Sequence, residues 1–310
     1  MRGRKNALRG RRIGVFGKGG CGKSTVVVLL ARALRRQGYE VCVVDADSTN
    51  VGLAAALGFA SHPASLMQRF GGTVFKGGPV TCPVDDPTPL AHAAIDLDAL
   101  EAPYVRQDGK GLSLVSLGKI TEDGVGAGCD GPVAKIARDL DVRRGGRPAL
   151  TLIDFKAGFE DWARGVITTL DWALVVVDPT TAAVEMMGRM DDVVNEIRAG
   201  TPPATSHLGD ATLVEAARRL YRNARIRGAL CVLNKVPDAE TEAYLRGRLA
   251  RSSIEPVAVL HEDAPIARAW LKGEPLVSDR LAEGADAVVA ALEAAAHRAP
   301  GPELGLEPAR

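Results

Sequence analysis

Aromatic residues and long apolar runs are both scarce in this sequence. Phenylalanine, tryptophan and tyrosine together make up 4% of its 310 residues, so a core has to be built mainly from valine, leucine, isoleucine and alanine. The longest apolar runs, such as those at residues 26–31 and 172–177, fall far short of the roughly 18 residues that a membrane-spanning helix needs. We therefore expect no transmembrane segment and no membrane partner.

The sequence also has almost no net charge, and its cysteines are not paired by spacing. A net charge of +1 argues against a surface that as a whole attracts nucleic acid, although local basic patches remain compatible with it. The five cysteines show no C-x-x-C spacing, and the basic start is followed by a glycine-rich loop instead of the apolar stretch of a signal peptide. These features fit a reducing compartment, and we expect a cytoplasmic protein.

Short β-branched runs alternate with helix-length segments from residue 13 onward. The runs lie at residues 13–16, 41–44, 112–117, 150–153, 174–177, 229–233 and 257–260, and helical patterns lie at 24–37, 181–198, 239–249, 264–272 and 282–297. This alternation predicts a single α/β domain with a mainly parallel sheet and helices on both faces. We expect a basic flexible arm at residues 1–12, the domain at 13–297 and a disordered, proline-rich tail at 298–310.

A glycine-rich loop between the first strand and the first helix carries the most informative motif. Residues 17–24 read G-K-G-G-C-G-K-S, a complete G-x-x-x-x-G-K-[ST] phosphate-binding loop. Its glycines let backbone N–H groups face phosphate oxygens, Lys23 supplies a charge for the β- and γ-phosphates, and Ser24 offers its hydroxyl to Mg²⁺. The residues expected to contact the nucleotide here are Gly17, Lys18, Gly19, Gly20, Cys21, Gly22, Lys23, Ser24 and Thr25.

Three acidic residues stand at the ends of predicted strands, where α/β sheets bind their ligands. Asp45 and Asp47 follow the run at 41–44, and Asp154 follows the run at 150–153. The first two either serve the metal and the attacking water or cap the following segment. Asp154 ends a Walker B pattern and is expected to hold a water of the Mg²⁺ shell. Gly158 fits a switch loop whose N–H senses the γ-phosphate.

Lys18 is a second lysine within the loop and needs an explanation of its own. The form K-G-G-x-G-K-S from residue 18 resembles the deviant Walker A loop of the MinD/ParA, nitrogenase iron protein and anion-pump ATPase group. The resemblance implies a nucleotide-dependent homodimer in which Lys18 reaches phosphates bound to the other subunit, as an arginine finger does. It also implies that Asp47 orients the hydrolytic water and that Asp45 belongs to the metal shell, so that Lys18, Lys23 and Asp47 are the catalytic residues. The alternative for Lys18 is a side chain that points to solvent.

The identity of the base can be argued from the residues that follow a later strand. Guanine readers among P-loop proteins carry Asn-Lys-x-Asp, but here Pro237 stands at the aspartate position and Asp238 comes one residue late. Asn234 and Lys235 resemble the adenine-side residues of the MinD-like group, and Asp263, followed by Ala-Pro, resembles the loop that closes over the base. We therefore expect ATP.

A narrower likeness rests on residues 154–160, D-F-K-A-G-F-E, and on Cys129 in a glycine-rich stretch. These resemble the nickel-maturation ATPases that serve carbon monoxide dehydrogenase, which implies a metalloenzyme client and a Zn²⁺ or Ni²⁺ site at the dimer interface. The paired C-x-C of those proteins is absent, because Asp130 and Gly131 follow Cys129. Two copies of Cys129 supply only two sulfurs, and an inert Cys129 is the equal alternative.

Two other functions compete with this interpretation. One is a partition or positioning ATPase of the ParA/MinD type that binds DNA or a protein partner. The basic residues available for DNA are the N-terminal arm and a cluster formed by Arg218, Arg219, Arg222, Arg225 and Arg227, which can also be a solvated helix face. The other is a P-loop small-molecule kinase, against which Lys18 and the pair Asp45 and Asp47 count.

Overall fold

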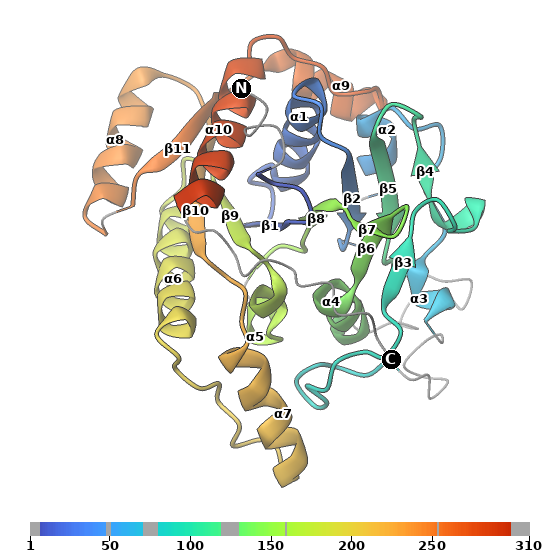
Figure 1. Cartoon of the computed structure of the whole chain (residues 1–310). Coiled ribbons are helices and arrows are strands. Elements are labelled where there is room, and N and C mark those ends of the chain that lie inside the picture. Colours follow the sequence, from blue (N-terminus) through green and yellow to red (C-terminus); the bar gives the residue numbers. More distant parts are fainter. Residues whose placement is uncertain are drawn as a thin grey trace.

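A central sheet dominates the computed structural model, which describes residues 7–47, 51–70, 80–118, 130–158, 160–252 and 254–298. Its strands are β1 (Arg12–Gly17), β2 (Val41–Asp45), β4 (Arg106–Gln107), β5 (Leu112–Ser116), β8 (Leu150–Asp154), β9 (Trp172–Val177), β10 (Gly228–Val236) and β11 (Pro256–His261). Among the described residues they form one eight-stranded sheet in the order β11-β10-β9-β1-β8-β2-β5-β4 (Figure 1). Only β4 pairs antiparallel with its neighbour, so the predicted mainly parallel α/β fold is confirmed.

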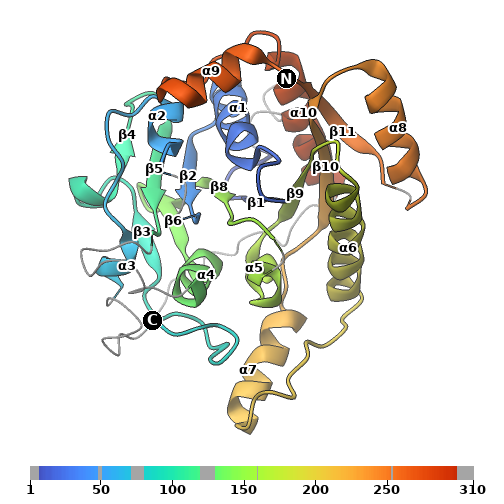
Figure 2. The ribbon, with the colours of Figure 1, turned by 180° about the vertical axis from the view of Figure 1, so that it is seen from behind.

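Helices cover both faces of the sheet (Figures 1 and 2). One face carries α1 (Lys23–Arg36), α2 (Leu53–Leu57), α9 (Ala264–Lys272) and α10 (Ala282–Arg298). The other carries α3 (Leu66–Arg69), α4 (Asp130–Asp139), α5 (Glu160–Ala163), η4 (Val166–Thr169), α6 (Thr181–Arg198) and α8 (Ala239–Ala250). The five predicted helices correspond to α1, α6, α8, α9 and α10. None of the described helices combines the length and the hydropathy that crossing a bilayer needs.

The core has two layers because side chains alternate along each strand. Ile13 and Val15 of β1 pack beneath α1 and α10, whereas Phe16 packs on the opposite face, where its ring stacks on Phe155 at 4.6 Å between centroids. β1, β2, β8 and β9 are buried along their whole length. Burial on both faces explains why these strands read as continuous Val, Ile and Leu runs.

Two parts of the fold were not predicted. A second sheet of three strands, β3 (Ala94–Asp96), β6 (Asp141–Arg144) and β7 (Arg147–Pro148), lies on the α4 side of the molecule. Helix α7 (Ala211–Arg222) extends away from the main sheet (Figure 1), and Ala217, at 7% exposed, is its one buried residue. Its start is fixed by Asp210, whose side chain accepts a hydrogen bond from the N–H of Thr212.

The N-terminal segment needs a correction. Leu8 is completely buried in the core, and Arg12 is the first residue of β1 and is 7% exposed. The Arg12 guanidinium donates hydrogen bonds to the carbonyl oxygens of Ala137 at 2.7 Å, Arg138 at 3.2 Å and Leu140, which satisfies carbonyls at the end of α4. The expected flexible arm is therefore wrong for residues 7–12; residues 1–6, and most of the expected tail, lie outside the described residues. Helix α10 includes residue 298.

Candidate nucleotide-binding site

The phosphate-binding loop joins β1 to α1 and is packed tightly against the neighbouring strand ends. A Cβ on Gly17 would lie 2.5 Å from the Cys21 sulfur and 2.7 Å from the carbonyl oxygen of Val176. Gly22 has φ +92, and a Cβ there would lie 2.3 Å from Nδ2 of Asn234. Both positions therefore require glycine, one for space and the other for space and backbone conformation.

Asn234 and Lys235 hold this loop from the end of β10. The Asn234 amide is 3% exposed and donates a 2.8 Å hydrogen bond to the carbonyl oxygen of Cys21. The Lys235 ammonium donates to the carbonyl oxygen of Gly20 at 2.8 Å, from a backbone in the left-handed region at φ +57. Both residues were predicted on the adenine side of the site, and the structure places them against the loop and in the wall of the same cavity.

Ser24 and Asp154 face each other where the metal was expected. The Ser24 hydroxyl donates a 2.6 Å hydrogen bond to Oδ2 of Asp154. Asp154 is fully buried, and its Oδ1 has no hydrogen-bond partner among the described residues. Burial and the charges of Asp45 and Asp47 raise the pKa of Asp154 to about 7, although the hydrogen bond from Ser24 lowers it. A buried carboxylate with a free oxygen beside a hydroxyl fits a hard divalent cation with oxygen ligands.

Asp45 and Asp47 lie at the end of β2, one strand away from Asp154. Asp45 is 2% exposed, and its Oδ1 accepts a 3.1 Å hydrogen bond from the N–H of Asp47. Its Oδ2 lies 3.0 Å from Nε2 of His62. Burial raises the pKa of Asp45, while the hydrogen bond to His62 lowers it, and that same bond raises the pKa of His62. Sequence reasoning missed His62, because no motif connects it to Asp45.

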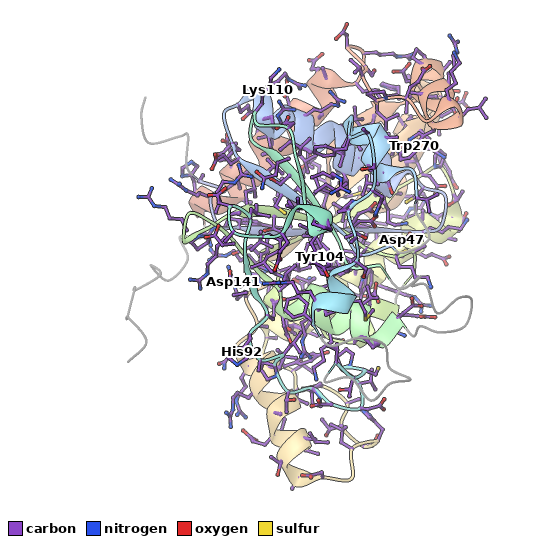
Figure 3. The ribbon with its side chains drawn as sticks, turned by 90° about the vertical axis from the view of Figure 1, so that its right-hand side faces the viewer. Asp47, His92, Tyr104, Lys110, Asp141 and Trp270 are labelled. Carbon is purple, nitrogen blue, oxygen red and sulfur yellow. The ribbon has the colours of Figure 1, made fainter. Side chains whose placement is uncertain are left out.

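A cavity of about 800 Å³ opens beside the loop, a size that suits a nucleotide. Its walls include Lys23 and Asp47. The Lys23 ammonium has no hydrogen-bond or ion-pair partner among the described residues. Asp263, the N-cap of α9, and Trp270 within α9 also line the cavity, and the Trp270 indole N–H donates to the Thr25 hydroxyl at 2.8 Å. Figure 3 shows Asp47 and Trp270 on the same side of the molecule. Trp270 was also missed, because its contact with Thr25 joins segments far apart in the sequence.

The remaining predicted residues fall at the rim of the site or outside the described residues. Lys18, Gly19 and Gly20 are exposed at the tip of the loop. The N–H of Gly158, with φ +100, donates a 3.4 Å hydrogen bond to the carbonyl oxygen of Gly17, which joins the loop after β8 to the phosphate-binding loop. Cys129 lies outside the described residues.

Within the described part of the chain, no group of three or more His, Cys, Asp and Glu side chains is arranged to hold a metal ion. This is compatible with Mg²⁺, which takes few protein ligands and keeps waters and substrate phosphates.

Residues 15–276 match the family described as the CobQ/CobB/MinD/ParA nucleotide binding domain. The chain belongs to this family. Among curated proteins, it is 29% identical over 204 residues to the carbon monoxide dehydrogenase accessory protein CooC of Rhodospirillum rubrum, covering 60% of this chain and 70% of that protein. It is 28% identical over 276 residues to an iron-sulfur cluster carrier protein of Pyrococcus horikoshii, covering 84% and 83%.

Solved structures in the MinD and ParA families share the fold. The septum site-determining protein MinD of Pyrococcus horikoshii, complexed with Mg-ADP, aligns with a TM-score of 0.56 and 19% identity over 93% of this chain and 95% of that one. A putative plasmid partition protein of Borrelia burgdorferi, bound to AMPPNP, aligns with a TM-score of 0.55 and 14% identity over 92% and 99%. These likenesses support the MinD/ParA-like P-loop fold of the chain.

Proposed function

We propose that this chain binds ATP with Mg²⁺ and hydrolyses it as a dimeric switch. The observation that carries the proposal is the convergence of the phosphate-binding loop with the acids at the ends of β2 and β8. Lys23, Ser24 and Asp47 line one cavity, and Ser24 is hydrogen-bonded to Asp154 behind it. This arrangement provides a phosphate cradle, a metal position and a candidate residue for the attacking water within one site.

Each residue has a separate task in this proposal. The Lys23 ammonium binds the β- and γ-phosphates, and the loop N–H groups donate hydrogen bonds to their oxygens. The Ser24 hydroxyl, Asp154 and Asp45 would hold Mg²⁺, which would supply positive charge to the phosphate oxygens. Asp47 accepts a hydrogen bond from the attacking water and orients it toward the γ-phosphorus. The water oxygen bonds to that phosphorus while the bond from the phosphorus to the bridging oxygen breaks, so ADP and phosphate leave and one proton of the water is released to solvent.

Lys18 is assigned to the second subunit's nucleotide. Its side chain is exposed at the loop tip and has no hydrogen-bond or ion-pair partner in the part of the chain that the structure describes. A lysine that is not needed in its own fold is available to contact phosphates across an interface. In a dimer whose two phosphate-binding loops face each other, Lys18 of each chain would complete the nucleotide site of the other chain.

The base is assigned to adenine. Pro237 stands where a guanine-binding aspartate would be, and the side chain of Asp238 instead caps α8 by accepting from the N–H of Thr241 at 2.8 Å. Competition of ATP and GTP for a fluorescent ADP analogue tests this assignment. ATP should displace the analogue at lower concentration, and equal displacement would contradict the assignment.

Hydrolysis tests the central proposal. Wild-type protein should release phosphate from ATP in Mg²⁺ and not in EDTA, and Lys23→Ala should lose both nucleotide binding and hydrolysis. Lys272→Ala, a change at an exposed lysine on α9 outside the lining of the cavity, serves as the matched control. A wild-type protein that binds no nucleotide would overturn the proposal.

For the client, we propose a metalloenzyme that receives a metal ion. Relatives include CooC of Rhodospirillum rubrum and the iron-sulfur cluster carrier protein of Pyrococcus horikoshii. One contact adds to this likeness: a Cβ on Gly131 would come within 2.8 Å of the Cys82 sulfur, and Cys129 stands two residues before Gly131 in the chain. We propose that Cys82 supplies the second thiolate of each chain beside that of Cys129, so that two chains provide four thiolates for Zn²⁺ or Ni²⁺ as cargo.

Metal analysis of the purified protein tests this assignment. With MgATP, the wild type should hold about one zinc or nickel ion per dimer, because four thiolates complete one tetrahedral site. Cys129→Ala and Cys82→Ala should each lose the ion, whereas Cys42→Ala, at a buried thiol in β2, should retain it. A metal-free wild-type dimer would contradict the metal role and leave ATP hydrolysis unaffected.

The exposed arginines of α7 favour a second candidate, a partition or positioning ATPase that binds DNA. Arg218, Arg219 and Arg222 are exposed, whereas Arg225 is 3.1 Å from the buried Asp171 and Arg227 is 3.5 Å from it, so these two have structural roles. In this case, a chain with MgATP should bind non-specific DNA with an affinity that falls steeply with salt. The combined change of Arg218 and Arg219 to alanine should weaken that binding.

A further inference from the structure

The side chain of His62 contacts the carboxylate of Asp45 across 17 positions of the chain. Nε2 of the imidazole lies 3.0 Å from Oδ2 of Asp45. The carboxylate is 2% exposed and the imidazole 32% exposed, so the contact lies at the boundary between the core and solvent. A carboxylate oxygen only accepts, so the Nε2–H donates to it.

Several contacts fasten the short segment that carries His62. The Arg106 guanidinium of β4 donates to the carbonyl oxygen of His62 at 3.0 Å and to the Ser61 hydroxyl at 3.1 Å. The next turn is tied by the N–H of Ala64, which donates to the carbonyl oxygen of Pro103 at 2.6 Å. Nδ1 of His62 lies 3.1 Å from the carbonyl oxygen of Pro63. The imidazole is therefore held by the edge of the sheet and by its own backbone, independently of the phosphate-binding loop.

Both oxygens of Asp45 have a donor as a result. Oδ1 accepts from the N–H of Asp47, and Oδ2 accepts from His62. Asp154 differs, because its Oδ1 has no partner among the described residues. Asp45 also stands near the charges of Asp47 and Asp154. Two donors fix the plane of the Asp45 carboxylate.

We infer that His62 is a positioning residue of the magnesium-nucleotide site, which fixes the Asp45 carboxylate in the orientation that a water of the metal shell requires. The inference rests on the proposed function, because it takes Asp45 as part of that shell. Hydrogen-bond partners of metal-binding groups contribute about 10- to 100-fold to metal affinity or activity when they are removed one at a time. His62 acts through Asp45 and touches neither nucleotide nor metal.

Calorimetry of ADP binding in Mg²⁺ and in EDTA tests the inference without depending on hydrolysis. In His62→Ala, the dissociation constant in EDTA should stay within about twofold of wild type, and the gain in affinity from Mg²⁺ should shrink by about tenfold. His297→Ala, at an exposed position near the end of α10, should behave as wild type. A His62→Ala protein that keeps the full gain from Mg²⁺ overturns the inference.

Two further variants separate positioning from packing. His62→Gln keeps an N–H donor at similar reach and should recover most of the gain from Mg²⁺, whereas His62→Phe keeps the ring and should not. Recovery in the Phe variant and not in the Gln variant would show a packing role and overturn the inference, even where His62→Ala folds poorly. A wild-type protein without any nucleotide binding would instead overturn the proposed function, and a wild type that binds ADP equally in Mg²⁺ and EDTA would contradict its metal site. A wild type that gains affinity from Mg²⁺, beside a His62→Ala protein with the same gain, overturns the inference alone.

Discussion

The hydroxyl of Ser24 donates a 2.6 Å hydrogen bond to Oδ2 of Asp154, which connects the first turn of α1 to the end of β8. Asp154 is completely buried and its Oδ1 has no partner among the described residues. The protein thus keeps a costly buried carboxylate at this position, as expected where a cation is to be bound.

Asp154→Asn should separate stability from function. The amide keeps an acceptor for Ser24 and removes the buried charge, so we expect the free energy of unfolding at pH 8 to fall by no more than about 1 kcal/mol. The Mg²⁺-dependent gain in ADP affinity should fall by about tenfold or more. Urea denaturation and calorimetry measure the two effects, and an Asn variant with the wild-type response to Mg²⁺ would contradict the metal assignment.

Gly22→Ala should lower the free energy of unfolding and the nucleotide affinity by more than the strain of its backbone conformation alone would. Gly22 and Gly38 have similar φ angles of +92 and +88, but a Cβ meets Asn234 at 2.3 Å in the first case and nothing within 4 Å in the second. Gly38→Ala should therefore cost only the left-handed strain, about 1–2 kcal/mol. Gly22→Ala should cost more and also abolish nucleotide binding. Thermal denaturation and ADP titration compare the pair, and equal effects would count against the packed loop.

Lys18→Ala should leave the fold intact and impair hydrolysis. Because the side chain is exposed, the free energy of unfolding should change by less than about 0.5 kcal/mol. If Lys18 acts across the dimer as an arginine finger does, kcat should fall by about a thousandfold. Lys110→Ala, also exposed and outside the loop, is the control, and a Lys18→Ala enzyme with wild-type kcat would refute the role in trans.

Asp86→Asn should destabilise the protein through the buried Lys135. The Lys135 ammonium is 2% exposed and lies 2.7 Å from Oδ2 of Asp86. Removing one partner leaves an uncompensated buried charge, which should lower the free energy of unfolding by about 3 kcal/mol. Asp85→Asn, at the exposed neighbouring residue, should change it by less than about 0.5 kcal/mol.

The same pair gives a pH dependence. Burial raises the pKa of Asp86, but hydrogen bonds from Lys135 and Thr88 lower it by more, so that the pKa falls from 3.8 to about 2. A depressed pKa means that the stability from this pair is fully present above about pH 4 and is lost as the pH falls toward 2. Denaturation between pH 5 and pH 2 should show a smaller loss in Asp86→Asn than in wild type, and equal losses would contradict the assignment.

The sequence was sufficient for the part of the fold that carries the phosphate-binding loop. β1, β2, β5, β8 and β9 are buried along their whole length, and β10 and β11 are buried in part. Their valine, leucine and isoleucine runs were therefore recognisable, and Gly17 to Ser24 could be placed between a strand and a helix. The small sheet was missed because β3, β6 and β7 have two to four residues each, too few for a periodic pattern. Leu8 and Arg12 were missed because a local composition rich in arginine does not reveal the partners that α4 and the core provide.

The residues of the candidate site also fall into those that the sequence could predict and those that it could not. Lys23, Ser24, Asp45, Asp47 and Asp154 belong to motifs whose spacing along the chain indicates their chemistry. His62, Trp270 and the proximity of Cys82 to Gly131 depend on contacts between segments far apart in sequence, which no spacing rule reveals.

The mass of the protein in solution tests the dimeric switch most directly. Wild-type protein and Lys18→Ala should each be measured by light scattering with Mg-ADP and with a non-hydrolysable ATP analogue in Mg²⁺. The account predicts one chain with Mg-ADP and two chains with the analogue for wild type, and a weaker dimer for Lys18→Ala. A wild-type mass of one chain in both nucleotides, at concentrations where the analogue is bound, would contradict it.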